Sequence, residues 1–251
     1  MKSEAKKGPG RRFIIVGLPR SGTTYLMTLL NAHKDVICAG ELFNPYAVVE
    51  HDDADYDLQR IFDRDKAPRY FCRQYFEKYE QEPWARIGFK LMLGHNIRLL
   101  TWLQEMEDVS ILYVHRNNRL AQVASYLKAL QTKKWAQTSR TPEMKKRIIA
   151  SPQQISHHWH EYAAMDFLFQ QWLKTLPGHK LWIEYREMFK PDFNSRLCDF
   201  LAIPADPKMK SPLVKQGLNR VIDRFENPGP IEAYVRHLGY PGWLDDELAG
   251  K

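Results

Sequence analysis

The sequence lacks the features that mark several common classes of protein. Its three cysteines lie far apart and form no CxxC pair, so neither a disulfide framework nor a zinc ribbon is indicated. It has no long hydrophobic run: the basic residues 1–12 lead into only four apolar residues and a glycine, so we expect neither a signal peptide nor a transmembrane segment. These absences predict a cytoplasmic protein.

No single sign of charge dominates either, although basic residues are in excess. The chain has 37 Lys and Arg against 30 Asp and Glu, a net charge of +7, which favours an anionic partner. No segment interleaves aromatic and basic residues as RNA-binding proteins do, so we predict no nucleic-acid partner. Contact with a membrane surface stays open, and so does a homodimer.

Short β-type runs alternate with longer helical patterns along the chain. This alternation predicts an α/β fold in which a parallel β-sheet is flanked by helices. At 251 residues, the length suits one core, and we expect residues 1–12 to be a disordered basic tail and 13–251 a single domain. The expected strands are 13–16, 36–38, 87–92, 110–114 and 180–185, and the expected helices are 23–32, 96–106, 120–130, 154–175 and 193–201. Segments 52–65 and 133–152 interrupt the pattern and are expected to be loops or substrate-covering insertions.

The segment GLPRSGTT, residues 17–24, joins the first expected strand to a helix, as a phosphate-binding loop does. The usual lysine is missing: Thr23 occupies its position, and the nearest cation is Arg20. Backbone N–H groups and the helix N-terminus favour an anion here, and an arginine fork matches several anionic oxygens. The candidate binding residues are Pro19, Arg20, Ser21, Gly22, Thr23 and Thr24.

A second constellation follows the strand expected at 110–114. Arg116 stands at the end of this strand, and Ser125 follows nine residues later in the next helix. Ligands of open parallel sheets bind beyond the carboxyl ends of strands, so both residues are expected near the first loop. No aspartate follows the strand to hold Mg²⁺, and we predict no metal. The HHWH segment, 157–160, spaces two histidines like metal ligands, but no further ligand is apparent, which favours a solvated helix face.

Together these segments resemble the sulfotransferases that use 3′-phosphoadenosine 5′-phosphosulfate (PAPS), and most closely the bacterial carbohydrate sulfotransferases typified by the nodulation-factor and trehalose enzymes. Across roughly residues 12–225, the similar features are PRSGTT, the Gly40 and Glu41 pair, Gly88 and Lys90 of a GxK strand, the spacing of Arg116 and Ser125, and more weakly Lys215, Gln216 and Arg220 of LVKQGLNR. Other sulfotransferases usually separate the arginine and serine by eight residues, which here would select Asn117.

The resemblance implies a P-loop-like fold and a division of the donor between two anion sites. The loop would bind the 5′-phosphosulfate, Arg116 and Ser125 the 3′-phosphate, and Lys215, Gln216 and Arg220 would complete the donor site. The acceptor would be a hydroxyl of a small molecule, a saccharide or a glycolipid, and Trp135 is a candidate for stacking on a sugar ring.

Sulfuryl transfer needs in-line geometry and stabilisation of charge on the leaving group. Arg20 would stabilise it, and Glu41 is the candidate general base, ranked above His33 and His95. Lys90 would contact the bridging oxygen or the acceptor, or else extend to solvent. The alternatives are a P-loop nucleotide phosphotransferase and a non-catalytic nucleotide-binding module, for which a base would be superfluous.

Overall fold

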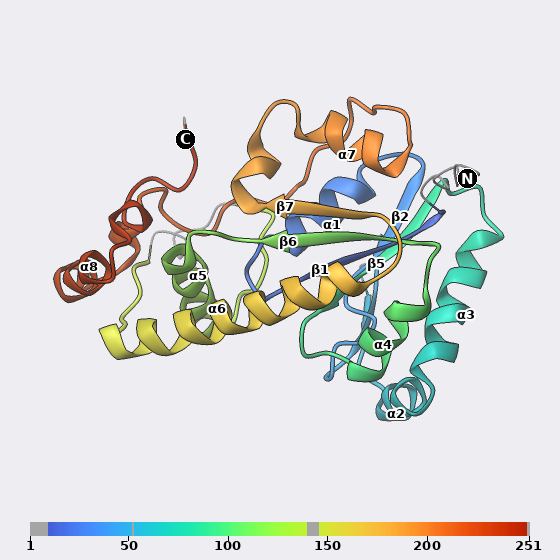
Figure 1. Cartoon of the computed structure of the whole chain (residues 1–251), viewed down its shortest axis with the longest axis horizontal. Coiled ribbons are helices and arrows are strands. Elements are labelled where there is room, and N and C mark those ends of the chain that lie inside the picture. Colours follow the sequence, from blue (N-terminus) through green and yellow to red (C-terminus); the bar gives the residue numbers. More distant parts are fainter. Residues whose placement is uncertain (1–9, 52, 140–145, 250–251) are drawn as a thin grey trace, which may run out of the picture.

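A parallel five-stranded sheet forms the centre of the computed structural model, which describes residues 10–51, 53–139 and 146–249. The strand order is β2-β5-β1-β6-β7 (Figure 1). The strands are β1 Arg12–Gly17, β2 Val36–Ala39, β5 Arg86–Met92, β6 Val109–His115 and β7 Lys180–Glu184. The sheet confirms the predicted α/β class, and each predicted strand is present to within a residue or two at its ends.

Both faces of the sheet are buried, which explains the nearly continuous apolar runs of its strands. In β1, Ile14 and Val16 belong to one core cluster, and Phe13 and Ile15 to the other, because successive side chains point to opposite faces. Figure 1 shows α1 (Thr23–Asn31) and α7 (Phe193–Leu201) on one side of the sheet, with α3 (Pro68–Glu80), α4 (Ile97–Trp102) and much of α6 (Pro152–Thr175) on the other.

A third cluster lies beyond the carboxyl ends of the central strands. It packs α5 (Arg119–Thr132) and the first half of α6 against α8 (Pro228–His237), around buried residues that include Leu18, Val123 and Phe225. The short helices η4 (Ile222–Arg224) and η5 (Pro241–Trp243) contribute Ile222 and Trp243. This packing brings the C-terminal part of the chain beside the loop that follows β1.

The prediction of a loop at 52–65 is wrong, whereas the alternative of a substrate-covering insertion stays a prediction. The described residues of this segment form β4 (Asp53–Asp55), which pairs with β3 (Val48–Glu50), and most of α2 (Leu58–Lys66), capped by Asp57. The buried positions of α2 are only Ile61 and Arg64, so the segment has almost no apolar pattern. The helix α3 was also not expected. By contrast, residues 133–139 and 146–151 contain no helix and no multi-residue strand, and 140–145 lie outside the described residues.

The remaining expectations concern the N-terminus, cysteines and membrane segments. Arg12, placed in the expected tail, begins β1 and pairs with Glu80 at 2.8 Å, whereas residues 1–9 lie outside the described part. The three cysteines are buried and unpaired. Within the described residues, no helix has both the length and the apolarity needed to span a membrane. The predicted helix at 96–106 is α4 followed by η1 (Leu103–Glu105), and η3 (Tyr185–Phe189) follows β7.

Candidate functional site

The loop between β1 and α1 has an unusual backbone. Arg20 adopts φ 64°, and Gly22 adopts φ 107°. A Cβ on Gly22 would lie 2.6 Å from Cε of Met188 and 2.8 Å from Cδ2 of Tyr185, so both conformation and space require glycine there. Arg20 has a Cβ and still adopts a left-handed backbone conformation. A non-glycine residue with positive φ often marks a functional site.

The N-terminus of α1 is open to an anion. Its N-cap residue is Gly22, which has no side chain to cap the N–H groups of the first turn. Thr23, in the position of the missing lysine, is 4% exposed and places its hydroxyl 3.5 Å from Sδ of Met92. No cation therefore takes the place of that lysine within the loop itself, and Arg20 remains the loop's positive side chain.

Arg20 connects the loop to three other segments. Its Nε donates to Oγ of Ser125 at 2.9 Å, and its Nη2 donates to Oε1 of Gln216 at 3.2 Å. Its Nη1 donates to the carbonyl of Trp135. Burial, together with the nearby Arg116 charge, lowers the pKa of Arg20 to about 10, so the guanidinium stays charged at neutral pH. The side chains of Ser125 and Gln216, candidates from separate segments of the sequence, thus both contact the guanidinium of Arg20.

Arg116 lies directly beside the same loop. Its Nη1 donates to the carbonyl of Arg20 at 2.9 Å, and its guanidinium carbon lies 4.3 Å from the ring centre of Tyr185. Its Nε donates to Oε1 of Glu247 at 2.7 Å. Ser125 contacts Arg20 rather than Arg116. The expected proximity of Arg116, Ser125 and the loop is therefore present, with Arg20 as the link.

A cavity of about 920 Å³ opens beside these residues. Its lining carries the cations Arg20, Arg116, Lys128, Lys190, Lys210, Lys215 and Arg224, and the carboxylate of Asp206. Gln216 also lines it, and its Nε2 is buried without a hydrogen-bond partner among the described residues. Because clustered cations in a concave site concentrate positive potential, the cavity suits a ligand with more than one anionic group.

Glu41 lies at a second centre that adjoins the cavity. Lys90 donates to Oε1 of Glu41 at 2.8 Å and to Oγ1 of Thr24 at 2.9 Å, and Thr24 lines the cavity. Asn44 donates from Nδ2 to Oε2 of Glu41 at 2.6 Å. The Glu41 side chain is 23% exposed, whereas that of Lys90 is 7% exposed, so Lys90 does not extend to solvent. Lys90 therefore links the cavity to a partly exposed carboxylate.

The charge of Glu41 is set by opposing effects. Burial alone would raise its pKa, but the Lys90 ammonium and the hydrogen bonds from Lys90 and Asn44 outweigh burial and lower the pKa below its usual value. His95 places Nε2 3.6 Å from Oε2 of Glu41, and burial lowers the pKa of His95 to about 4 although Glu41 opposes this. At neutral pH, an ionised carboxylate thus faces a neutral imidazole.

The two histidines considered as rival bases, His33 and His95, lie in different surroundings. His33 is 2% exposed, and its Nε2 lies 2.8 Å from the carbonyl of Pro204 while Nδ1 accepts from the backbone of Asp35. These contacts give His33 a structural role in the turn before β2. His95, by contrast, adjoins Glu41 directly.

Other candidates lie at varying distance from the cavity. Arg220 is outside the lining; its side chain is 61% exposed and lies 3.9 Å from Asp223. The carbonyl of Pro19 accepts from Nε2 of Gln122 at 2.8 Å, which fixes the loop on α5. Ser21 is fully buried, and its Oγ has no hydrogen-bond partner among the described residues.

Three residues near the cavity were not predicted from the sequence: Gln122, Arg224 and Glu247. Gln122 supports the loop, Arg224 lines the cavity, and Glu247 pairs with Arg224 at 2.6 Å. Their only sequence signal is the polarity of residues in otherwise packed segments. No local spacing relates a glutamate near residue 250 to an arginine at 116, so only the tertiary fold reveals them.

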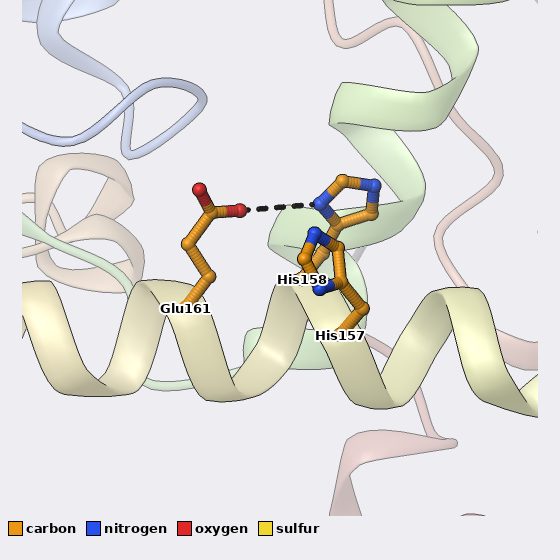
Figure 2. Close-up of side chains that lie close together, drawn as sticks. All are labelled: His157, His158 and Glu161. Atoms are coloured by element: carbon orange, nitrogen blue, oxygen red, sulfur yellow. Dashed lines mark hydrogen bonds and ion pairs between the residues drawn. The ribbon is translucent and has the colours of Figure 1, made fainter.

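The histidine-rich start of α6 holds a group of metal-ligand type, shown in Figure 2. It consists of His157, His158 and Glu161, rather than the pair of His157 and His160 considered from the sequence. The three ligand atoms lie within 4.8 Å of one another, and Nδ1 of His158 lies 3.4 Å from Oε2 of Glu161. None of these residues lines the cavity, so we give the group no part in the site.

Comparison with known proteins identifies the family. A model described as "Sulfotransferase family" matches residues 12–207, which include the loop, Glu41, Lys90, Arg116 and Ser125. The chain belongs to the sulfotransferase family. The resemblance drawn from the PRSGTT loop and its companions is thereby confirmed.

Two relatives of this sulfotransferase are both named Nodulation protein H. The protein of Rhizobium meliloti (strain 1021) is 28% identical over 130 residues, which cover 51% of each chain. That of Rhizobium tropici is 26% identical over 198 residues, covering 77% of this chain and 76% of the relative. The chain therefore spans only about half the length of the first relative. Among solved structures, the "Sulfotransferase Domain from the Curacin Biosynthetic Pathway" is 18% identical, with a TM-score of 0.48 over 90% of this chain and 82% of that one.

Proposed function

We propose that this sulfotransferase moves the sulfuryl group of PAPS to a hydroxyl of a saccharide or glycolipid. The observation that carries the proposal is the Lys90 side chain, which contacts Thr24 at the cavity and Glu41 beyond it. A site that only binds a nucleotide needs no carboxylate there. Sulfuryl transfer needs both an anion site for the donor and a base for the acceptor.

The donor would occupy the cavity. The open N-terminus of α1 and the Arg20 guanidinium would bind the 5′-phosphosulfate, and Arg116, Lys215 and Arg224 would bind a second phosphate. The unpartnered Nε2 of Gln216 offers one more donor to an anionic oxygen. The seven cations of the lining would supply the positive charge, so we expect no metal in the reaction.

The reaction would be an in-line displacement. The acceptor oxygen attacks sulfur as the bond from sulfur to the bridging phosphate oxygen breaks, and adenosine 3′,5′-bisphosphate leaves. Glu41 takes the proton of the attacking hydroxyl, and Lys90 stabilises the charge that develops on the bridging oxygen. Lys90 also keeps Glu41 ionised and oriented before the acceptor arrives.

The saccharide acceptor rests on the resemblance to carbohydrate sulfotransferases and on Trp135. This residue lines the cavity and is 50% exposed, so its ring is available for stacking on a sugar. Its carbonyl accepts from Arg20, which would connect acceptor and donor sites.

The phosphotransferase alternative is less well supported. Thr23 occupies the position of the catalytic lysine of a P-loop and is buried against Met92, so the loop offers no lysine to a terminal phosphate.

The test is sulfuryl transfer by the purified protein from ³⁵S-labelled PAPS to saccharide, glycolipid and phenolic acceptors. We expect label in a saccharide or glycolipid product, formed at least about 100-fold more slowly by Glu41→Gln. Labelling of phenols alone would overturn the acceptor class. Absence of any transfer, together with phosphate transfer from ATP, would overturn the reaction.

A further inference from the structure

Glu247 lies at the centre of a buried cluster of charges, outside the residues matched by the family model. Its side chain has 0% exposure. Oε1 accepts from Nε of Arg116 at 2.7 Å, whereas Oε2 lies 2.6 Å from Nη2 of Arg224 and 3.3 Å from Nζ of Lys215. One carboxylate thus contacts three cations: Arg116, which follows β6, and Lys215 and Arg224 of one C-terminal segment.

The carboxylate lies behind these cations as seen from the cavity. Arg116, Lys215 and Arg224 all line the cavity, and Glu247 does not. A guanidinium has five N–H donors, so the contacts of Arg116 with Glu247 and with the Arg20 carbonyl leave donors for a ligand. Glu247 therefore does not occupy the anion site but supports its wall.

The backbone around Glu247 is tied to the segment that carries the other two cations. The N–H of Glu247 donates to the carbonyl of Asn219 at 3.0 Å, and the N–H of Leu248 donates to Oδ1 of the same residue at 3.1 Å. The N–H of Val221 donates to the carbonyl of Asp245 at 3.1 Å. These bonds fix where the carboxylate lies relative to Lys215 and Arg224.

We propose that Glu247 is a positioning residue for the donor site, which arranges Arg116, Lys215 and Arg224 to receive one phosphate group. The inference rests on the proposed function, because it assigns that group to the 3′-phosphate of the donor. Three neighbouring cations repel one another, and the carboxylate offsets this repulsion. The net charge of about +2 that remains matches a phosphate dianion.

The test compares two nucleotides that differ in one phosphate: adenosine 3′,5′-bisphosphate and adenosine 5′-monophosphate. Calorimetry measures the dissociation constant of each for the wild type, Glu247→Gln and Glu247→Asp. Glu232→Gln is the control, because Glu232 forms an exposed pair with Arg236, with the glutamate side chain 42% exposed.

We expect Glu247→Gln to weaken binding of the bisphosphate by about tenfold or more, on the scale of a disrupted buried charge pair, and binding of the monophosphate by less than about threefold. The reason is geometric. Glu247 accepts on both oxygens, whereas glutamine accepts on one and presents an N–H₂ group to a cation on the other side. Glu247→Asp keeps the charge but is shorter, so we expect a smaller loss of the same selectivity.

Simple Coulomb attraction predicts the opposite change in affinity for Glu247→Gln, which is tighter binding of the bisphosphate. Removing a negative charge beside immobile cations would tighten binding of the bisphosphate, so tighter or unchanged binding by a folded Glu247→Gln variant would overturn the positioning role. If that variant does not fold, Glu247→Asp decides: selectivity equal to that of the wild type would overturn the inference. Failure of the proposed function is distinguishable, because the wild type itself would then show no preference for the bisphosphate.

Discussion

Arg20 combines an unfavourable backbone conformation with several side-chain hydrogen bonds. Its backbone is left-handed, and its guanidinium donates to Ser125, Gln216 and the Trp135 carbonyl. In an ordinary turn, glycine or asparagine would accept that conformation with less strain. The arrangement makes sense if the guanidinium must face an anion at the N-terminus of α1.

Replacing Arg20 by alanine is therefore expected to abolish transfer. We predict a loss of at least about 100-fold in kcat/KM, the scale of one donor to a developing charge. Steady-state kinetics with PAPS measures it, and Arg236→Ala, which alters only an exposed pair, is the control. Full activity of the Arg20 variant would contradict the assignment.

Glu41 is expected to affect turnover rather than donor binding. Glutamine keeps the size of the side chain but cannot accept the proton, so Glu41→Gln should lower kcat by about 100-fold or more. The dissociation constant for adenosine 3′,5′-bisphosphate should stay within about threefold, because Glu41 does not line the donor cavity. Glu105→Gln, at an exposed pair with Arg69, is the matched control. Loss of nucleotide binding instead would make Glu41 structural.

The titration of Lys215 is expected to make the affinity for the donor depend on pH. Burial, with the charges of Arg224 and Arg116, outweighs the opposing effect of Glu247 and lowers the pKa of Lys215 to about 8. Lys215 is charged below that value and loses its charge as pH rises through it, so affinity for an anion should fall between about pH 7 and pH 9. Calorimetry with adenosine 3′,5′-bisphosphate measures the slope.

Lys215→Arg is the control for this slope. Arginine keeps its charge over the whole range, so the variant should show a flatter dependence. An equal slope in both proteins would assign the titration to another group.

At the scale of elements, the turn from β1 into α1 determines the shape of the site. Gly22→Ala should lower the free energy of unfolding by about 2 kcal/mol or more, because the new methyl combines a positive φ with overlap onto Met188 and Tyr185. Thermal and denaturant unfolding measure the change.

Gly242→Ala in η5 provides the contrast. Apart from its chain neighbours and its own helix backbone, Gly242 has no atom within 4 Å of a new Cβ, and its φ is not positive, so alanine should raise the free energy of unfolding by about 0.5 kcal/mol. An equal change in the free energy of unfolding in both variants would contradict the prediction that the close contacts at Gly22 make alanine destabilising there.

Element order was predictable where the pattern was local. The apolar run of β1 and the spacing of α7 depend on neighbours in sequence, and both were found as predicted. The helix α2 was missed because it buries only Ile61 and Arg64, and Arg64 donates to the carbonyls of Leu42, Asn44 and Ala47. A helix held by a buried arginine has no apolar periodicity to detect.

The candidate site residues likewise divide into those recognisable from local sequence and those that only the tertiary fold reveals. PRSGTT, Glu41 and Arg116 could be proposed as candidates because they follow predicted strands, and Lys90 and Ser125 mainly because of the resemblance to the sulfotransferases. Glu247 and Arg224 could not, since Glu247 contacts Arg116 and Arg224 only through the tertiary fold. The link from Lys90 to both Thr24 and Glu41 is also a tertiary fact.

At the scale of the whole molecule, the sheet collects two kinds of chemistry at one edge. Cations from the loop, the end of β6 and the C-terminal part surround a cavity, and the ends of β2 and β5 add Glu41 and Lys90 beside it. The cavity lining carries seven Lys and Arg side chains and the carboxylate of Asp206, so positive charge is in excess where an anionic donor would bind. We propose that this cavity binds the donor nucleotide without a metal.

The most direct measurement is calorimetric titration of the wild type with adenosine 3′,5′-bisphosphate in the presence of EDTA, beside ATP with Mg²⁺. We expect the bisphosphate to bind with EDTA present, more tightly than ATP with Mg²⁺, and Arg20→Ala to abolish this binding. Binding of ATP that requires Mg²⁺, with none of the bisphosphate, would contradict this proposal.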